Sequence, residues 1–258
     1  MLCKQRSKMQ RFTFYLSRLL FVVLLLLPGF AKAGPQLDVG ALYDYLEPGK
    51  GTYAKRIYNR GDSTAFVKVS VLELVYDGEG EPREVDVDEL PFDQRSVVAS
   101  PARMIIPARG MQAVRLLYRG ERAQERYYRL RFVPVLPEQD DSFALDDAEL
   151  EAYRNELNAG VQFLAGYGTI LIAKPTATQY QTSIERAGGK WTVRNAGNAT
   201  VLLDNVQTCV RGDDDCDHPA KHHLRPGRTR EFIEKTGVEY RFELVEGDAR
   251  KAIDLKAG

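Results

Sequence analysis

Short runs of alternating side chains, separated by turn residues, fill the sequence from Gln36 to its end. In AFVKVSVLELVY, residues 65–76, Val67, Val69 and Val71 alternate with Phe66, Lys68 and Ser70, and the run stops at the turn DGEG, 77–80. Because side chains two positions apart share one face of a β-strand, each run predicts a strand with one face in a core. Repeated at this spacing, the runs predict an all-β protein built as a sandwich.

A single segment shows a sustained helical period. DDAELEAYRNEL, residues 146–157, places Asp146 at the cap position, and Leu150, Tyr153 and Leu157 then share one face. We therefore expect one short helix in an otherwise β-rich chain.

The alternating pattern is interrupted near Pro175, where KPTATQ (174–179) has the composition of a short linker. A second series of short strands and glycine-rich turns follows it. Strands in this number and spacing are typical of immunoglobulin-like sandwiches. The sequence predicts two such domains, an N-terminal one over 34–174 and a C-terminal one over 175–258.

The N-terminus has the pattern of a secretory signal peptide. Basic residues precede the apolar run LLFVVLLLLPGF (19–30), and Ala31-Lys32-Ala33 follows it. The run is well short of the ~20 apolar residues that a membrane-spanning helix needs. We therefore expect residues 1–33 to be removed on export to an oxidising compartment, the periplasm.

Export changes the charge balance of the chain. The whole sequence has 36 basic and 36 acidic residues, and the leader has six basic and no acidic ones. The mature chain would thus carry 30 basic and 36 acidic residues, a net charge of −6. Since no basic face stands out, we expect no nucleic-acid partner.

Two cysteines remain after the leader, Cys209 and Cys216, and we expect them to form a disulfide that closes a small loop. The alternative is a metal site, because the three histidines lie close by within 218–223. The spacing of these residues does not follow a usual structural-zinc pattern, so the disulfide is preferred and no metal is predicted.

Catalytic signatures are scarce. The sequence contains no G-x-S-x-G, no H-E-x-x-H and no glycine-rich phosphate loop. We predict a protein that is not an enzyme and has no cofactor.

The stretch VQFLAGYGTILIAKP, residues 161–175, is uncharged until Lys174. Both of its faces are apolar or small. A central strand, buried on both sides, is the commoner explanation for such a run. The alternative is an edge strand, because an exposed apolar edge is normally avoided and one that is kept usually pairs with a partner strand.

Two neighbouring sequence segments resemble a known family, and this resemblance favours the edge strand. SPARMIIPARGMQAVRL (100–116), followed by ERYYRLRFVPVLP (125–137), resembles the periplasmic pilus-assembly chaperones of the PapD-like type. The paired cysteines resemble the hairpin of the alternate-chaperone branch that serves alpha-type fimbriae. The resemblance implies two immunoglobulin-like domains in a boomerang arrangement. It also implies a chaperone that binds pilin subunits by donor-strand complementation and delivers them to an outer-membrane usher.

The same resemblance implies roles for individual residues. Residues 161–175 would be the donor strand, with Val161, Phe163, Ala165 and Tyr167 inserted into the subunit. Glu125 and Lys174 would form a charged pair between the domains.

The family holds the carboxylate at the C-terminus of the subunit with two basic residues, and here this chain departs from the family. The corresponding positions fall on Tyr43 and Ile170, and neither is basic. Candidates for the carboxylate anchor are then Tyr43, Thr169 and Lys174, with Arg129 or Arg131 as a source of charge on a neighbouring strand.

Two other functions are compatible with parts of the sequence. One is a fimbrial structural or adhesive subunit, although GPQLDVGALYDYL (34–46) enters a strand too early to leave a donor extension. The other is a periplasmic metal-binding protein that uses the 209–223 cluster. A free chaperone with such a strand could be a monomer or a self-capping homodimer.

Overall fold

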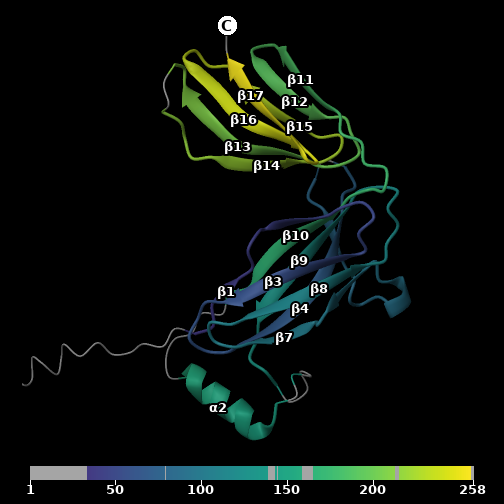
Figure 1. Ribbon diagram of the computed structural model, residues 1–258, viewed down its shortest axis with the longest axis vertical. Helices are drawn as coiled ribbons and strands as arrows, with labels where there is room; N and C mark the ends of the chain where they lie inside the picture. The colour runs from purple at the N-terminus through teal and green to yellow at the C-terminus, as the bar shows by residue number, and fades with distance from the viewer. Residues whose placement is uncertain are drawn as a thin grey trace, which may run out of the picture. The chain divides into compact units, whose positions relative to one another are not determined.

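The computed structural model describes residues 34–78, 80–138, 143, 145–158, 165–212 and 215–256. Strands dominate these residues and form two sandwiches, one built by β1 to β10 and one by β11 to β17 (Figure 1). The predicted all-β fold with two sandwiches is confirmed. The predicted signal peptide, 1–33, lies outside the described residues.

The N-terminal sandwich packs a four-stranded sheet against a six-stranded one. The first sheet has the order β1-β3-β8-β6: β1 (Leu37–Asp38), β3 (Thr52–Asn59), β8 (Met111–Tyr118) and β6 (Val97–Ser100). The second has the order β2-β10-β9-β4-β5, and β7 also pairs with β4: β2 (Tyr43–Leu46), β10 (Tyr167–Ala173), β9 (Arg126–Pro134), β4 (Ala65–Val75), β5 (Arg83–Asp86) and β7 (Arg103–Ile106). A 3-10 turn, η1 (Phe92–Gln94), lies between β5 and β6.

Alternation along β4 explains how these sheets meet. Val67, Val69 and Val71 are buried in the core between the two sheets, as the alternation predicts. Phe66 belongs to a different apolar cluster, which contains Phe143 and Tyr153 instead. Strand β4 therefore contributes to two separate packing surfaces, one on each of its faces.

The C-terminal sandwich is smaller and has its own core. One sheet has three strands in the order β11-β12-β15: β11 (Thr182–Ala187), β12 (Lys190–Asn195) and β15 (Thr229–Ile233). The other has four in the order β14-β13-β16-β17: β14 (Ala220–Leu224), β13 (Val201–Val210), β16 (Val238–Glu246) and β17 (Ala249–Lys256). Its core includes Val193, Leu203 and Phe242.

A buried asparagine stabilises the turn between β3 and β4 of the N-terminal sandwich. Asn59 ends β3, and its Oδ1 accepts a hydrogen bond from the backbone N–H of Gly61 at 3.0 Å. Its Nδ2 donates to the carbonyls of Ser63 and Ile106 at 2.7 and 3.1 Å. With the N–H of Gln36 at 3.1 Å and the carbonyl of Pro107 at 3.2 Å, this one side chain bonds to five backbone groups.

The C-terminal sandwich repeats this arrangement with Asn195 at the end of β12. Its Oδ1 accepts from the N–H of Gly197 at 3.0 Å, and its Nδ2 donates to the carbonyls of Ala199 and Leu224, each at 2.8 Å. The two sandwiches therefore use the same local device at equivalent places.

Both turns also require glycine for the same reason. A Cβ on Gly61 would collide with the backbone carbonyl of Gly34, and one on Gly197 would collide with that of Gln179. The chain that enters each sandwich lies directly against its N-x-G turn.

The helix α2 (Asp147–Asn158) confirms the helix predicted over 146–157, shifted by one residue. Asp146 caps it as predicted: its Oδ1 accepts from the N–H of Glu149 at 2.8 Å, and Glu149 Oε2 accepts from the N–H of Asp146 at 3.0 Å. This is a reciprocal capping box. Leu150 and Tyr153 are buried, as their shared face predicts.

None of the helices in the described part of the chain is long and apolar enough to cross a membrane.

Candidate functional site: strand β10 and the contacts between the sandwiches

Strand β10 is central along one half and lies at an edge along the other. Ile170–Ala173 pairs with β2 in parallel and with β9 in antiparallel register. Residues 167–169 pair with β9 alone among the described strands. The difference arises because β2 begins at Tyr43, which lies opposite Ile170. Both sequence interpretations of this strand thus describe a part of it.

Side chains of β10 alternate between the core and the outer face. Thr169, Leu171 and Ala173 are buried, and Tyr167 packs half-buried against the same core. Ala165 precedes the strand and is exposed. Val161 and Phe163, the other two predicted donor residues, lie outside the described residues.

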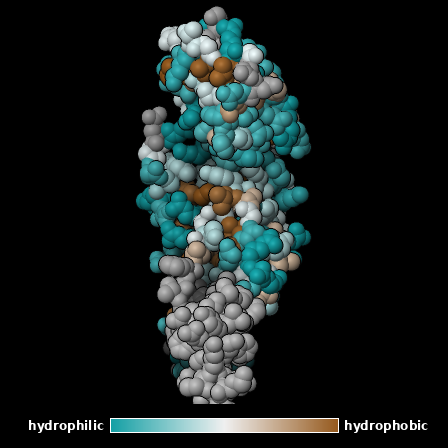
Figure 2. Space-filling model, turned by 90° about the vertical axis from the view of Figure 1, so that its left-hand side faces the viewer, coloured by the Kyte–Doolittle hydropathy of each residue, from teal (hydrophilic) through white to brown (hydrophobic). Residues whose placement is uncertain are grey.

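The described surface retains exposed apolar side chains, among them Leu42, Val133 and Leu136. Figure 2 shows that apolar surface on the face in view is gathered in patches within a largely hydrophilic surround. Leu42 immediately precedes β2, and Val133 lies in β9 beside the partner of Tyr167.

The two positions expected to hold the carboxylate anchor lie side by side. Ile170 and Tyr43 are direct partners in the parallel pairing of β10 with β2. Tyr43 is 42% exposed, and its ring stacks on His223 with the ring centroids 3.6 Å apart. Arg129 is the partner of Ile170 on the other side, and its guanidinium is hydrogen-bonded to Glu84.

Thr169 faces the core, so its hydroxyl is turned away from solvent. The residue is 0% exposed, and its Oγ1 has no hydrogen-bond partner among the described residues. It lies one residue before the outward-facing Ile170, and successive side chains point to opposite faces of a strand. In this state of the protein Thr169 does not present its hydroxyl to a partner.

Lys174 is engaged by a residue other than the predicted one. Its Nζ donates to the two carboxylate oxygens of Glu47 at 2.8 and 3.0 Å. Burial alone would lower the pKa of Lys174, but the hydrogen bonds and charges of Glu47 and Tyr180 together outweigh burial and raise the pKa. Of the predicted charged pair Glu125 and Lys174, the lysine thus has Glu47, close to the end of β2, as its direct ion-pair partner.

Glu125 nevertheless joins the two sandwiches, through Thr200. Its carboxylate accepts from Thr200 N and Oγ1 at 2.8 and 2.5 Å, and from the hydroxyl of Tyr127. Burial raises the pKa of Glu125, while these bonds and the charge of Lys174 oppose the rise. Lys174 therefore still acts on Glu125, through space.

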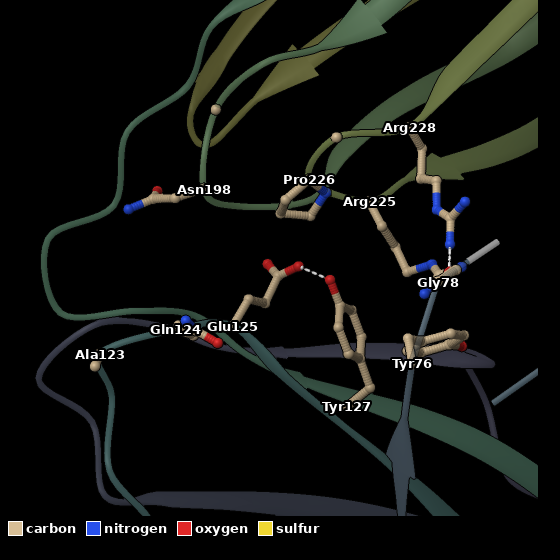
Figure 3. A pocket seen from close by; sticks show the side chains of 12 residues that line it. Tyr76, Gly78, Ala123, Gln124, Glu125, Tyr127, Asn198, Arg225, Pro226 and Arg228 are labelled. Carbon is tan, nitrogen blue, oxygen red and sulfur yellow. Dashed lines mark hydrogen bonds between the residues drawn. The ribbon is translucent and has the colours of Figure 1, made fainter. Parts of the chain in front are cut away.

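A pocket of about 610 Å³ lies beside this contact (Figure 3). Figure 3 shows Glu125, Tyr127 and Tyr76 along one side and Arg225 and Arg228 reaching down from the other. Tyr76 and Tyr127 meet edge to face with their ring centroids 5.3 Å apart. The Arg225 guanidinium lies over the Tyr76 ring at 3.3 Å.

His223 makes a further contact between the sandwiches. Besides the stack with Tyr43, its Nδ1 lies 2.6 Å from the hydroxyl of Tyr45. Burial lowers the pKa of His223 to about 4, and the charges of Lys221 and His222 add to the effect. The ring is thus neutral near pH 7, and its Nδ1 shares a hydrogen bond with the hydroxyl of Tyr45.

The structure contains the predicted disulfide between Cys209 and Cys216. The bond removes both thiols from the ligand set of the alternative metal site. Within the residues that the structure describes, no group of three or more His, Cys, Asp or Glu side chains is placed to hold a metal ion.

Sequence reasoning missed the part that His223 and Arg225 play between the sandwiches. The only signal near them was the histidine cluster, and it indicated a metal. Their partners Tyr45 and Tyr76 are 178 and 149 positions away in the sequence. Contacts at such separations leave no local pattern.

Comparison with known proteins gives relatives that cover most of this chain, although no family model matches the sequence. The probable fimbrial chaperone EcpB of Klebsiella pneumoniae is 28% identical over 230 residues, which cover 87% of this chain and 93% of the relative.

Two solved structures share the fold. The class 5 fimbriae chaperone CfaA has a TM-score of 0.53 at 18% identity and covers 86% of this chain and 100% of its own. A chain from the CsuC–CsuE chaperone–tip adhesion subunit complex of Acinetobacter baumannii has a TM-score of 0.50 at 16% identity, with coverage of 87% and 99%. The resemblance carried by residues 100–137 is therefore confirmed: the chain is similar in sequence to a probable fimbrial chaperone over most of its length and shares the fold of fimbrial chaperones of solved structure.

Proposed function

We propose that this protein is a fimbrial chaperone that captures pilin subunits in the periplasm by lending them β10 and the residues before it. The observation that carries the proposal is the half-open edge of β10. Tyr167 and Thr169 belong to a strand that is anchored in the sheet from Ile170 onward, but β2 does not cover them. A partner strand can add along such an edge.

We infer the donor residues by continuing the alternation of β10 toward its N-terminal side. Tyr167 points into the core, so Ala165, Phe163 and Val161 would follow with the same parity if β10 were extended on capture. Each apolar side chain that becomes buried contributes about 1.5–3 kcal/mol before the costs of association. The role is stoichiometric binding, with delivery to an outer-membrane usher and no turnover.

For the carboxylate at the end of the subunit we propose Tyr43 as the contact, because Thr169 faces the core and Lys174 is held by Glu47. A tyrosine hydroxyl can donate to a carboxylate, and a charge-assisted bond of this kind contributes about 1.5–3 kcal/mol.

Export by cleavage of 1–33 and a domain boundary at 174/175 complete the proposal. Strand β10 ends at Ala173 and β11 begins at Thr182, which is consistent with such a boundary. The paired cysteines Cys209 and Cys216 also fit an oxidising compartment.

Co-purification from the native periplasm tests the donor role. Tagged mature protein is isolated, its partners are identified by mass spectrometry, and the stoichiometry is read from the native mass. We expect a one-to-one complex with a small fimbrial subunit. The double variant Val161→Asp with Phe163→Asp should lose this subunit, because two charges cannot be buried in an apolar groove.

A matched control places the same charges elsewhere. Val210 and Ile233 are apolar and exposed in the C-terminal sandwich, so Val210→Asp with Ile233→Asp should retain the subunit. If the Val161/Phe163 variant captured as much subunit as the control, the assignment of these residues as donor residues would be wrong.

A further inference from the structure

One arginine in the pocket of Figure 3 has a charge without a polar partner. No hydrogen bond or ion pair joins the Arg225 guanidinium to any residue that the structure describes. Its neighbour Arg228, by contrast, donates to the carbonyl of Gly78. The N–H donors of Arg225 are therefore available in a pocket of about 610 Å³.

The guanidinium is nonetheless held in place. It lies 3.3 Å from the centroid of the Tyr76 ring, which Tyr127 supports edge to face. Tyr127 is fixed by its bond to Glu125, and Glu125 by its bonds to Thr200. A stacked arginine has already lost most of its rotamer freedom, so binding an anion costs it little more.

The charges around the pocket favour a single negative charge. Arg225, Arg228 and Glu125 are the charged side chains that line it. Two cations and one carboxylate leave a balance of one positive charge, and a doubly charged group such as phosphate would be repelled by Glu125. The planar fork of a guanidinium fits the two oxygens of a carboxylate.

We propose that Arg225 forms a binding site for a carboxylate group in this pocket. Two sources carry that group: a small organic acid, and an acidic side chain of a protein bound to the chaperone. The chemistry at Arg225 is the same for both. The proposal goes beyond donor-strand capture and does not require it.

Arginine side-chain NMR tests the site without a subunit. The Nε–H signal of Arg225, assigned by its loss in Arg225→Lys, is followed while sodium acetate is added, with sodium chloride at equal ionic strength as the reference. We expect a saturable shift with acetate and none with chloride. Arg250 is exposed and bound to Glu243, so its Nε–H signal is the internal control.

A second arm distinguishes the two sources. The subunit identified by co-purification is bound to the wild type and to Arg225→Gln and Arg250→Gln. Weaker binding by about tenfold in Arg225→Gln alone assigns the carboxylate to the bound protein, because a charge-assisted bond contributes roughly 1.4 kcal/mol or more.

An acetate shift with unchanged subunit binding assigns the site to a small acid. The proposal is overturned if acetate moves Arg225 no more than Arg250 and the Arg225→Gln variant binds the subunit like the wild type. The acetate titration needs no subunit. A failure of the chaperone proposal therefore leaves its result unaffected, and the two proposals are tested separately.

Discussion

At the scale of single residues, the side chains of Asn59 and Asn195 each satisfy backbone groups that would otherwise be buried without partners. Alanine at Asn195 removes its bonds to one N–H and two carbonyls, and alanine at Asn59 removes its bonds to two N–H groups and three carbonyls. Each unsatisfied buried group costs about 1–3 kcal/mol. We expect Asn59→Ala and Asn195→Ala each to lower the free energy of unfolding by roughly 3 kcal/mol or more, measured by urea titration.

Asn198→Ala is the control for this prediction. Asn198 lies in the same turn as Asn195, but its bonds to Ala177 and Gln179 are solvent-exposed. Water can replace them, so the cost should stay near or below ~1 kcal/mol. Equal losses for Asn195→Ala and Asn198→Ala would contradict the buried role of Asn195.

These asparagines also show what a sequence reveals at this scale. The segments around Asn59 and Asn195 are recognisable as turns because glycine follows two residues later. Burial of the asparagine amide depends on carbonyls from strands that are distant in sequence, such as that of Ile106, 47 residues away. Turn chemistry is local and predictable, whereas the partners of the side chain are not.

At the scale of elements, the stability of α2 depends on contacts with residues outside its own segment. A helix of twelve residues is marginal by itself in water. Tyr153 packs edge to face against Phe66, 4.7 Å between ring centroids, and its hydroxyl donates to the carbonyl of Thr64 at 2.9 Å. Phe143 completes this cluster, which is separate from the main core of the sandwich.

We therefore expect Tyr153→Ala to melt α2 without unfolding the sandwich. Amide hydrogen exchange over residues 147–158 should become about tenfold faster or more, since the lost aromatic packing exceeds ~1.4 kcal/mol. Protection in β4 and β9 should stay unchanged. The exposed neighbour Arg154 provides the control Arg154→Ala, and equal exchange rates in both variants would refute the docking of α2 through Tyr153.

The elements differ in how far the sequence determines them. The existence and cap of α2 were predictable because the capping box and the apolar face lie within the segment itself. Its docking site was not, since Phe66 is 87 residues from Tyr153. The same holds for β10: its apolar character was evident, but its division into a central and an edge half depends on where β2 begins.

At the scale of the whole molecule, side chains that meet between the sandwiches form a series of contacts with few direct ion pairs. Tyr45 meets His223, Glu125 meets Thr200, and Tyr76 lies under Arg225. The sequence predicted a charged pair of Glu125 and Lys174 here; in the structure the direct partner of the Glu125 carboxylate is Thr200, and the charge of Lys174 acts on it through space. Burial favours hydrogen-bonded partners for a carboxylate, and one backbone N–H and two hydroxyl groups donate to Glu125.

His223 makes these contacts sensitive to acid. Its pKa is about 4 in the folded protein, against about 6.5 for an unperturbed histidine. Between these values the unfolded chain binds more protons than the folded one, so the free energy of unfolding falls as the pH is lowered from about 6.5 towards 4. The stability that neutral His223 contributes is fully present above pH ~6.5.

Comparison with His223→Gln isolates this effect from the carboxylates that also titrate in this range. Thermal unfolding of both proteins is followed from pH 7.5 to 4.5. We expect the wild type to be more stable than the variant at pH 7.5, because glutamine keeps an acceptor but loses the stack on Tyr43. The difference in Tm should shrink steadily below pH 6.5, since protonation of His223 expels the ring from its site beside Tyr45. His218→Gln controls for a histidine outside this contact, and a Tm difference between the wild type and His223→Gln that stays constant down to pH 4.5 would show that His223 is not the group that titrates.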